Sequence, residues 1–134
     1  WMILQADKPE DWVIATGTTT SVRDFVILSF MEVGVELEFK GTGVDEQAFV
    51  TACNNPAYQL EIGKQVVSVD PTYFRPSEVD TLIGDASKAK NKLGWVPKYD
   101  LGYLVKDMMA SDITLMKKEQ YLKDGGYSTL NYFE

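Results

Sequence analysis

Histidine is absent from this sequence of 134 residues, and cysteine occurs once, at Cys53. The lack of histidine excludes a Ser-His-Asp triad, a Cys-His pair and any His-ligated metal site. One cysteine cannot build a disulfide framework and suits a reducing compartment, so we expect a cytoplasmic protein without a metal site. Any chemistry in this chain has to come from carboxylates, lysine, tyrosine or serine.

Basic residues and long apolar runs are also scarce. Thirteen Lys and Arg residues face 20 Asp and Glu residues, which gives a net charge of −7 and argues against a nucleic-acid partner. No run approaches the ~20 apolar residues of a membrane span. Residues 1–5 lack the basic leader of a signal peptide and are similar to the last turn of a helix, so we expect a fragment of a longer protein.

The first third of the chain predicts a strand, a helix and a second strand. Residues 12–17 form a short β-rich apolar run, which is typical of a buried strand. Ser21 followed by Asp24 predicts a helix start, and Gly34 ends the helical spacing. Residues 35–39 alternate with period two, as in a half-buried strand. This order predicts an α/β fold with parallel strands, whose faces would need a neighbour outside this chain.

The remaining elements are predicted from turn residues and helical spacing. We expect strands at 48–53 and 65–70, followed by an extended loop that two prolines bracket at 71–76. A short helix is predicted at 86–93, and a long amphipathic helix from residue 100 to about residue 118.

Two motifs argue against redox or acid–base chemistry within the chain. Gly41-Thr42-Gly43 matches half of a dinucleotide fingerprint, but Glu46 occupies the third glycine position and no helix follows, so we interpret it as a turn. No tyrosine is followed four positions later by lysine, so a Tyr/Lys catalytic pair is absent. We expect Cys53 to be a buried structural thiol.

The most informative residues are Arg75 and Glu78, in the proline-bracketed segment beside Tyr73 and Phe74. An arginine fork binds phosphate oxygens with two donors, and a carboxylate accepts hydrogen bonds from ribose hydroxyls. Together they would suit a nucleoside diphosphate. Spacing alone also allows an Arg75–Glu78 surface ion pair with the aromatic residues in a core.

Several motifs in this region resemble the C-terminal part of GDP-mannose 4,6-dehydratases, which belong to the extended short-chain dehydrogenase/reductase group. The resemblance rests on YFRPSEVD at 73–80, GDASKAK at 84–90 and LGWVP at 93–97, supported by IATG at 14–17 and SVRDFV at 21–26. It extends along the whole chain. GDASKAK and LGWVP occur across the group, whereas YFRPSEVD and SVRDFV point to this family.

The resemblance implies an α/β fold made of two parts. Residues 1–34 would be the C-terminal edge of an NAD(P)-binding Rossmann-type domain, and residues 35–134 a small mixed α/β substrate-binding domain with a C-terminal tail. The family's reaction converts GDP-mannose to GDP-4-keto-6-deoxymannose with NADP, a step towards GDP-fucose and related deoxysugars. Its cofactor-binding and catalytic motifs would precede residue 1, so we assign no catalytic or cofactor-binding residue here and expect the chain to be inactive alone.

By the same resemblance, Arg75 would contact the diphosphate and Glu78 the ribose hydroxyls, with Tyr73 lining the pocket. Arg23 would either approach the ligand or support the first turn of its helix. Thr72 stands where the family usually has a basic residue, so any contribution of that residue is lacking.

The implied partners are GDP-mannose, the N-terminal Rossmann portion of the same enzyme and further copies in a dimer or tetramer. Two alternatives remain open at this point. The chain could belong to another nucleotide-sugar dehydratase or epimerase, or it could be a non-catalytic nucleotide-binding or interaction module.

Overall fold

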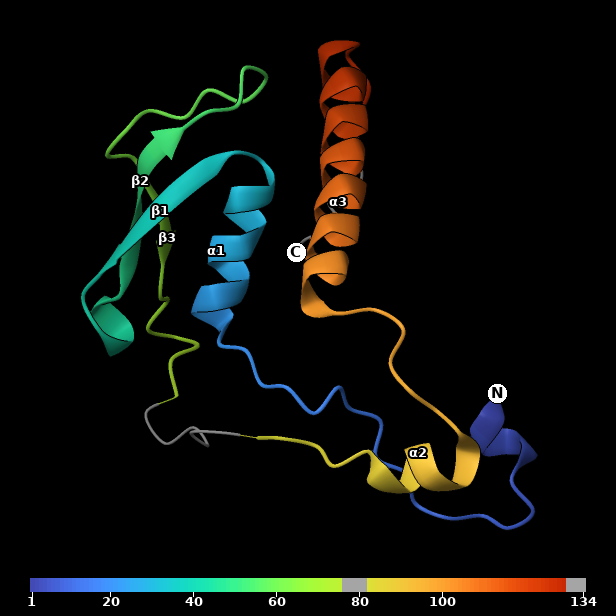
Figure 1. Cartoon of the computed structure of the whole chain (residues 1–134). Coiled ribbons are helices and arrows are strands. Elements are labelled where there is room, and N and C mark those ends of the chain that lie inside the picture. The colour runs from blue at the N-terminus through green and yellow to red at the C-terminus, as the bar shows by residue number, and fades with distance from the viewer. Residues whose placement is uncertain (76–81, 130–134) are drawn as a thin grey trace.

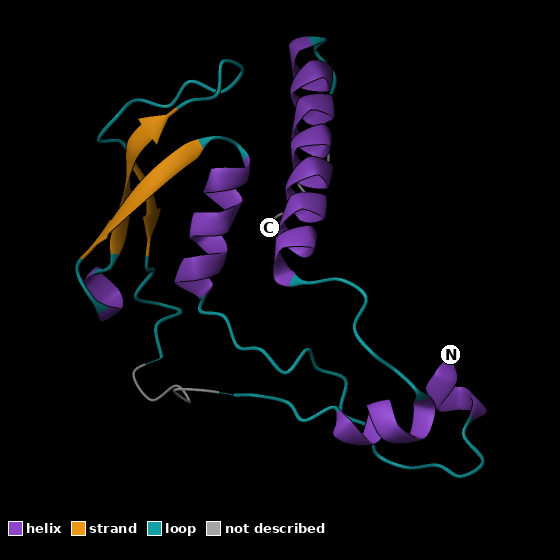
Figure 2. Ribbon diagram, in the orientation of Figure 1, coloured by secondary structure: helices purple, strands orange, loops and turns teal. Residues whose placement is uncertain are grey.

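The structure, a computed structural model, describes residues 1–75 and 82–129, and it is mixed α/β as the sequence predicts. Figures 1 and 2 show the sheet, helix α1 and helix α3 side by side, with helix α2 and the N-terminus in a separate region below. The elements in chain order are η1 (Met2–Gln5), α1 (Val22–Glu32), β1 (Val35–Lys40), η2 (Gly43–Asp45), β2 (Gln47–Cys53), β3 (Gln65–Ser68), α2 (Ser87–Leu93) and α3 (Leu101–Asp124).

The sheet is antiparallel, in the order β1-β2-β3, so the predicted parallel arrangement is wrong for the described strands. The three strands themselves form close to where the sequence predicts them. Residues 41–46 join β1 to β2 and residues 54–64 join β2 to β3, without the crossover helix that a parallel pair needs. Along β1, Val35 is buried and Leu37 and Phe39 are half-buried, whereas Glu36 and Glu38 are exposed. One face of the sheet therefore packs on the core and the other faces solvent.

Helix α1 lies between the sheet and α3 and contacts both (Figure 1). It begins as predicted, because the Ser21 hydroxyl accepts a hydrogen bond from the Asp24 amide at 3.0 Å. The same hydroxyl donates to the Asp24 carboxylate at 2.7 Å. Gly34 follows the helix with a φ of 72°, a left-handed conformation that glycine adopts without a steric penalty.

Helix α3 begins at Leu101, where the Asp100 carboxylate accepts from the Tyr103 amide at 2.8 Å. It continues to Asp124, six residues beyond the predicted end. Its inward face includes the buried Val105 and the half-buried Met109 and Ile113. The loop before β3 also reaches this helix, since the Lys117 ammonium lies 5.3 Å from the Tyr58 ring centroid.

The region below the sheet is made of two chain segments, residues 1–19 and 82–98, that run beside each other (Figure 1). Lys88 donates to the Asp11 carbonyl at 2.8 Å and lies over the Trp12 ring at 4.9 Å. Glu10 forms ion pairs with both Lys88 and Lys92, at 2.9 and 2.8 Å. Together, these two lysines attach α2 to the N-terminal segment.

The strand predicted at residues 12–17 does not form. The segment has no β-ladder partner among residues 1–75 and 82–129, and the Val13 and Ile14 side chains remain about half exposed. Local sequence can favour extended backbone, but a strand also needs a neighbour to receive its hydrogen bonds.

The described part of the chain has a small core. Its buried hydrophobic residues are Val35, Ala48, Val50, Ala89 and Val105. The chain exposes 10902 Å² to solvent. A compact monomer of 15.1 kDa exposes about 7,100 Å² by the relation between area and mass.

None of the described helices is both long and apolar enough to cross a membrane.

Candidate functional site

The β1–β2 connection is a closed turn whose geometry depends on Gly41. This residue has a φ of 81°, and a Cβ built on it would lie 2.3 Å from the Asp45 carbonyl oxygen. The turn leads into η2, which has three residues, and then into β2. A pyrophosphate fingerprint needs a glycine turn that leads directly into a helix, whose N-terminus faces the phosphates. The Gly41 turn therefore does not fit a dinucleotide such as NADP, in agreement with its interpretation from sequence.

Arg23 extends from the first turn of α1 to this connection. Its Nε donates to Oε1 of Glu46, the residue between η2 and β2. Its guanidinium carbon lies 5.8 Å from the centroid of the Phe39 ring. The hydrogen bond to Glu46, with the Coulombic attraction of the same carboxylate, raises the pKa of the Arg23 guanidinium above its usual value. The ion pair is asymmetric, because 52% of the Arg23 side chain is exposed but only 18% of the Glu46 side chain.

The loop that carries Arg75 starts from the same place. The Val69 amide donates to the Glu46 carbonyl at 3.2 Å as the chain leaves β3. Asp70 then closes a turn, accepting from the Thr72 amide at 2.8 Å through its carboxylate and from the Tyr73 amide at 3.1 Å through its carbonyl. These bonds make residues 70–73 a turn, so the first half of the loop is not extended as the sequence predicts.

Phe74 packs against the β1–β2 connection. A Cβ built on Gly43 would lie 3.5 Å from Cζ of the Phe74 ring, so the ring packs on the Gly43 backbone. Arg75 follows directly and is exposed. Tyr73 is 81% exposed, so it lies on the surface of this loop rather than within a core.

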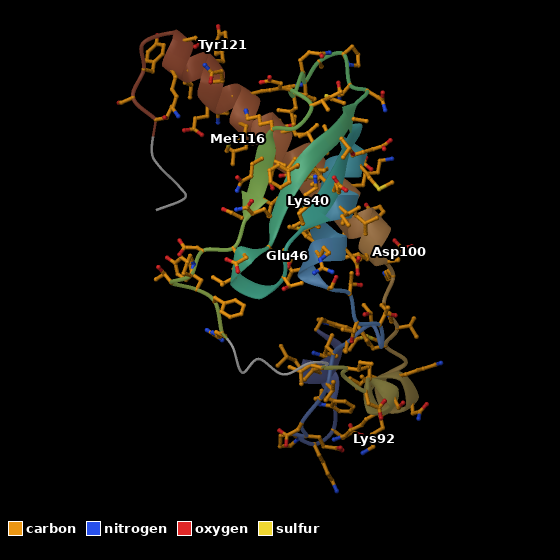
Figure 3. The ribbon with its side chains drawn as sticks, turned by 90° about the vertical axis from the view of Figure 1, so that its left-hand side faces the viewer. Lys40, Glu46, Lys92, Asp100, Met116 and Tyr121 are labelled. Atoms are coloured by element: carbon orange, nitrogen blue, oxygen red, sulfur yellow. The ribbon has the colours of Figure 1, made fainter. Side chains whose placement is uncertain are left out.

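Three of the four predicted site residues thus belong to one end of the sheet. Arg23 comes from the start of α1, and Tyr73 and Arg75 come from the loop after β3. Glu46, whose position Figure 3 marks at the lower end of the sheet, contacts both elements. Glu78 lies outside the described residues, so its predicted ribose contact stays a prediction.

Sequence reasoning missed the part played by Glu46, which it treated only as a mismatch to a glycine motif. One available signal was a carboxylate directly before a strand with an apolar inward face. A carboxylate that becomes mostly buried normally needs a charged or hydrogen-bonding partner. The partner, Arg23, lies 23 positions away in sequence, and no local pattern relates the two.

Two surface hollows that described residues line lie elsewhere. One, of about 860 Å³, is bounded by Thr16, Thr18 and Thr20 on one side and by the start of α3 on the other. Its rim includes Tyr99 and Tyr103, whose rings stack with centroids 4.4 Å apart. A second, of about 460 Å³, lies between residues 5–12 and Lys92. Neither contains Tyr73 or Arg75. The described residues also hold no group of three or more His, Cys, Asp or Glu side chains able to bind a metal ion.

The Cys53 thiol is half-buried rather than buried. It donates to the Tyr58 carbonyl at 2.9 Å and accepts from the Leu60 amide at 3.5 Å. Both contacts are to backbone groups of the β2–β3 loop, which agrees with a structural thiol.

Comparison with known proteins gives consistent matches. The sequence profile of the family described as GDP-mannose 4,6 dehydratase matches residues 1–108. A protein of Vibrio cholerae serotype O1 named GDP-mannose 4,6-dehydratase is 50% identical over 129 residues, which cover 96% of this chain and 35% of that protein.

Two further relatives carry the same name. The one from Yersinia enterocolitica is 48% identical over 128 residues, covering 95% of this chain and 34% of the relative. The one from Drosophila melanogaster is 48% identical over 120 residues, covering 88% of this chain and 28% of the relative. The chain therefore spans about a third of the length of the curated relatives it matches.

Proposed function

Because the chain belongs to the GDP-mannose 4,6-dehydratase family, we propose that it forms the nucleotide-sugar-binding part of an enzyme that converts GDP-mannose to GDP-4-keto-6-deoxymannose. The relatives are named as enzymes, and in this proposal the reaction is the lyase step implied by that name. The observation that carries the proposal is the shared end of the sheet, where an exposed Arg75 follows a loop anchored to the turn that also holds Arg23.

In this proposal the two arginines bind the diphosphate. The planar guanidinium of Arg75 offers paired N–H donors that match two phosphate oxygens, and its charge is permanent at physiological pH. Arg23 supplies a second cation at the same end of the sheet, and half of its side chain faces solvent. We assign Glu78 to the ribose hydroxyls and Tyr73 to the wall of the pocket. None of these groups makes or breaks a bond, so the chain's own contribution is binding and orientation.

We place the chemical steps and the NADP site in a part of the enzyme outside this chain. The Gly41 turn leads into a three-residue helical turn and then a strand, which does not fit a dinucleotide. No tyrosine of the sequence is followed four positions later by lysine, so the Tyr/Lys motif that would move protons is absent. Residues 1–34 would then complete the Rossmann-type domain and residues 35–134 would form the substrate domain. The single cysteine supports a cytoplasmic setting.

The large solvent-exposed area supports the proposal that another part of the enzyme, or another copy, covers part of this chain. The excess over a compact monomer of the same mass is about 3,800 Å². A standard protein interface buries about 800 Å² on each side, so the excess corresponds to several interfaces. We propose that the remaining two thirds of the enzyme covers much of it, above all at the unpaired 12–17 segment, and that further copies in a dimer or tetramer cover the rest.

Isothermal titration calorimetry with GDP and GDP-mannose tests the binding role. Loss of one partner from a charged hydrogen bond costs about 1.5–3 kcal/mol, so Arg75→Ala should weaken both ligands about 10- to 150-fold. Lys64→Ala removes the same charge from the β2–β3 loop and should leave both affinities unchanged. Absence of GDP binding to the wild-type chain, or equal affinities for wild type and Arg75→Ala, would reject the proposal.

A further inference from the structure

Glu46 makes two contacts that serve different elements of the site. Its carboxylate pairs with Arg23 on the first turn of α1, and its carbonyl oxygen accepts the Val69 amide at the start of the loop that carries Arg75. Three residues earlier, Gly43 provides the surface on which Phe74 packs. The segment from Gly43 to Glu46 is therefore in contact with both arginine-bearing elements.

The location of Arg23 explains why it needs a carboxylate. The first turn of a helix carries the positive end of the helix dipole, so an arginine there is repelled by its own helix. The long side chain also has much rotational freedom to lose before it can hold one orientation. The negative charge of Glu46 offsets this repulsion. Its carboxylate also accepts a hydrogen bond from Nε and so holds the guanidinium of Arg23 in one orientation.

The orientation that results suits anion binding. Nε belongs to the side edge of the guanidinium, so the contact with Glu46 engages that edge. The end edge, which the two terminal nitrogens form, is another edge with which arginine binds phosphate. The carboxylate is mostly shielded from solvent and the guanidinium is half exposed. A ligand approaching this end of the sheet would therefore meet the cation rather than the anion.

We infer that Glu46 is a positioning residue for diphosphate binding, acting through its side chain on Arg23. This inference rests on the proposed function, because it assumes that the ligand is a nucleoside diphosphate. Glu46 itself does not touch the ligand. Its backbone bond to Val69 survives any side-chain substitution, so the two contacts can be separated by mutation.

The test is a double-mutant cycle read by GDP affinity in calorimetry. Glu46→Ala should weaken GDP binding about 5- to 10-fold in the wild-type background, within the usual range for coupled neighbours. In the Arg23→Met background the same substitution should cause no further loss, because its target is gone. Glu46→Gln keeps the shape and an oxygen acceptor but not the charge, and should fall between wild type and Glu46→Ala.

The control is Glu38→Ala, which removes an equally charged residue from the exposed face of β1, where its partner is Lys40. It should leave GDP affinity unchanged. A merely structural role of Glu46 would instead lower affinity equally in both Arg23 backgrounds, and that result would overturn the inference. If Glu46→Ala fails to fold, the cycle is run with Glu46→Gln, and an affinity equal to wild type would likewise reject it.

The cycle also separates this inference from the proposed function. If Arg75→Ala weakens GDP binding and Glu46→Ala and Glu46→Gln do not, only the positioning role fails. If the wild-type chain does not bind GDP, or Arg75→Ala binds as tightly as wild type, the proposed function fails and the positioning role fails with it.

Discussion

Gly84 lies directly against Ala15, at a distance that leaves no room for a side chain. A Cβ built on Gly84 would be 2.6 Å from the Ala15 Cβ and 3.2 Å from a methyl carbon of Val13. The contact joins two chain segments nearly 70 positions apart, and a hydrogen bond of 3.0 Å from the Thr19 hydroxyl to the Leu82 carbonyl continues it.

Gly84→Ala should therefore destabilise the chain. Overpacking of a close contact typically costs about 1–3 kcal/mol in free energy of unfolding, measured by urea denaturation. Ala15→Gly in the same chain removes the closest clashing atom and should restore part of the loss. Gly102→Ala, within the first turn of α3, meets only the Asp100 carboxylate at 3.6 Å and should be neutral or stabilising. An unchanged stability for Gly84→Ala would contradict the observed contact.

Gly41 and Gly63 share a left-handed conformation but differ in their surroundings. Both have φ above 80°, yet nothing lies within 4 Å of a Cβ on Gly63, whereas the Asp45 carbonyl lies 2.3 Å from one on Gly41. Gly63→Ala should cost only the conformational strain, about 1–2 kcal/mol. Gly41→Ala should cost more in the same urea experiment, because the turn must also open. Equal losses for the two variants would show that the closed turn does not matter.

Ser21→Ala should shorten or fray α1 at its start. Loss of an N-cap hydroxyl costs about 0.5–2 kcal/mol, and no other side chain within the described residues accepts from the Asp24 amide. The expected result is a lower unfolding midpoint and reduced helicity by circular dichroism. Ser21→Asp keeps an acceptor at the cap and should retain most of the stability, and Thr20→Ala next to it should change little. Equal stabilities for Ser21→Ala and Thr20→Ala would argue against the cap.

The Glu10 carboxylate should titrate far below an ordinary glutamate. Hydrogen bonds from Lys92 and then Lys88 lower its pKa from 4.5 to about 2. Because the pKa in the folded chain is depressed, the stabilisation from this cluster is complete above the unfolded value near 4.5. It is lost as the pH falls through about 2. A carboxyl chemical-shift titration by NMR measures the folded value directly.

Lys92→Met removes the hydrogen bond that lowers the pKa of Glu10 most, so this pKa should rise towards 4.5. The hydrogen bond from Lys88 remains and should keep the pKa below that value. Lys64→Met, remote from the cluster, should leave the titration unchanged. A wild-type pKa near 4.5 would show that the two lysines do not hold Glu10 in solution.

The elements that the sequence predicted well depend on residues close together in the chain. Ser21 and Asp24 define the start of α1 within four residues, and Asp100 does the same for α3. The end of α3 was predicted too early, because no glycine or proline interrupts residues 118–124 and the polar run there is compatible with helix. A local stop signal comes only with the glycine pair at 125–126.

The features that sequence did not predict depend on distant partners. Residues 12–17 have the composition of a strand, but the described residues offer no strand to receive their backbone hydrogen bonds. The Arg23–Glu46 ion pair joins an α1 residue to the β1–β2 connection, and neither residue signals the other locally. Motif resemblance singled out Arg75 as a candidate without geometry, whereas the pairing of Glu46 with Arg23 is visible only in the folded chain.

The two outer strands of the sheet differ in how they resist aggregation. Both β1 and β3 pair on one side only within the described residues, and an open strand edge can template pairing with another molecule. On β1, the exposed Glu36, Glu38 and Lys40 place charges along the edge strand, which disfavours that pairing. β3 carries no charged side chain but has only four residues, too few for a long continuous pairing. A hydrophobic substitution on β1 would therefore promote self-association more than the same change on β3.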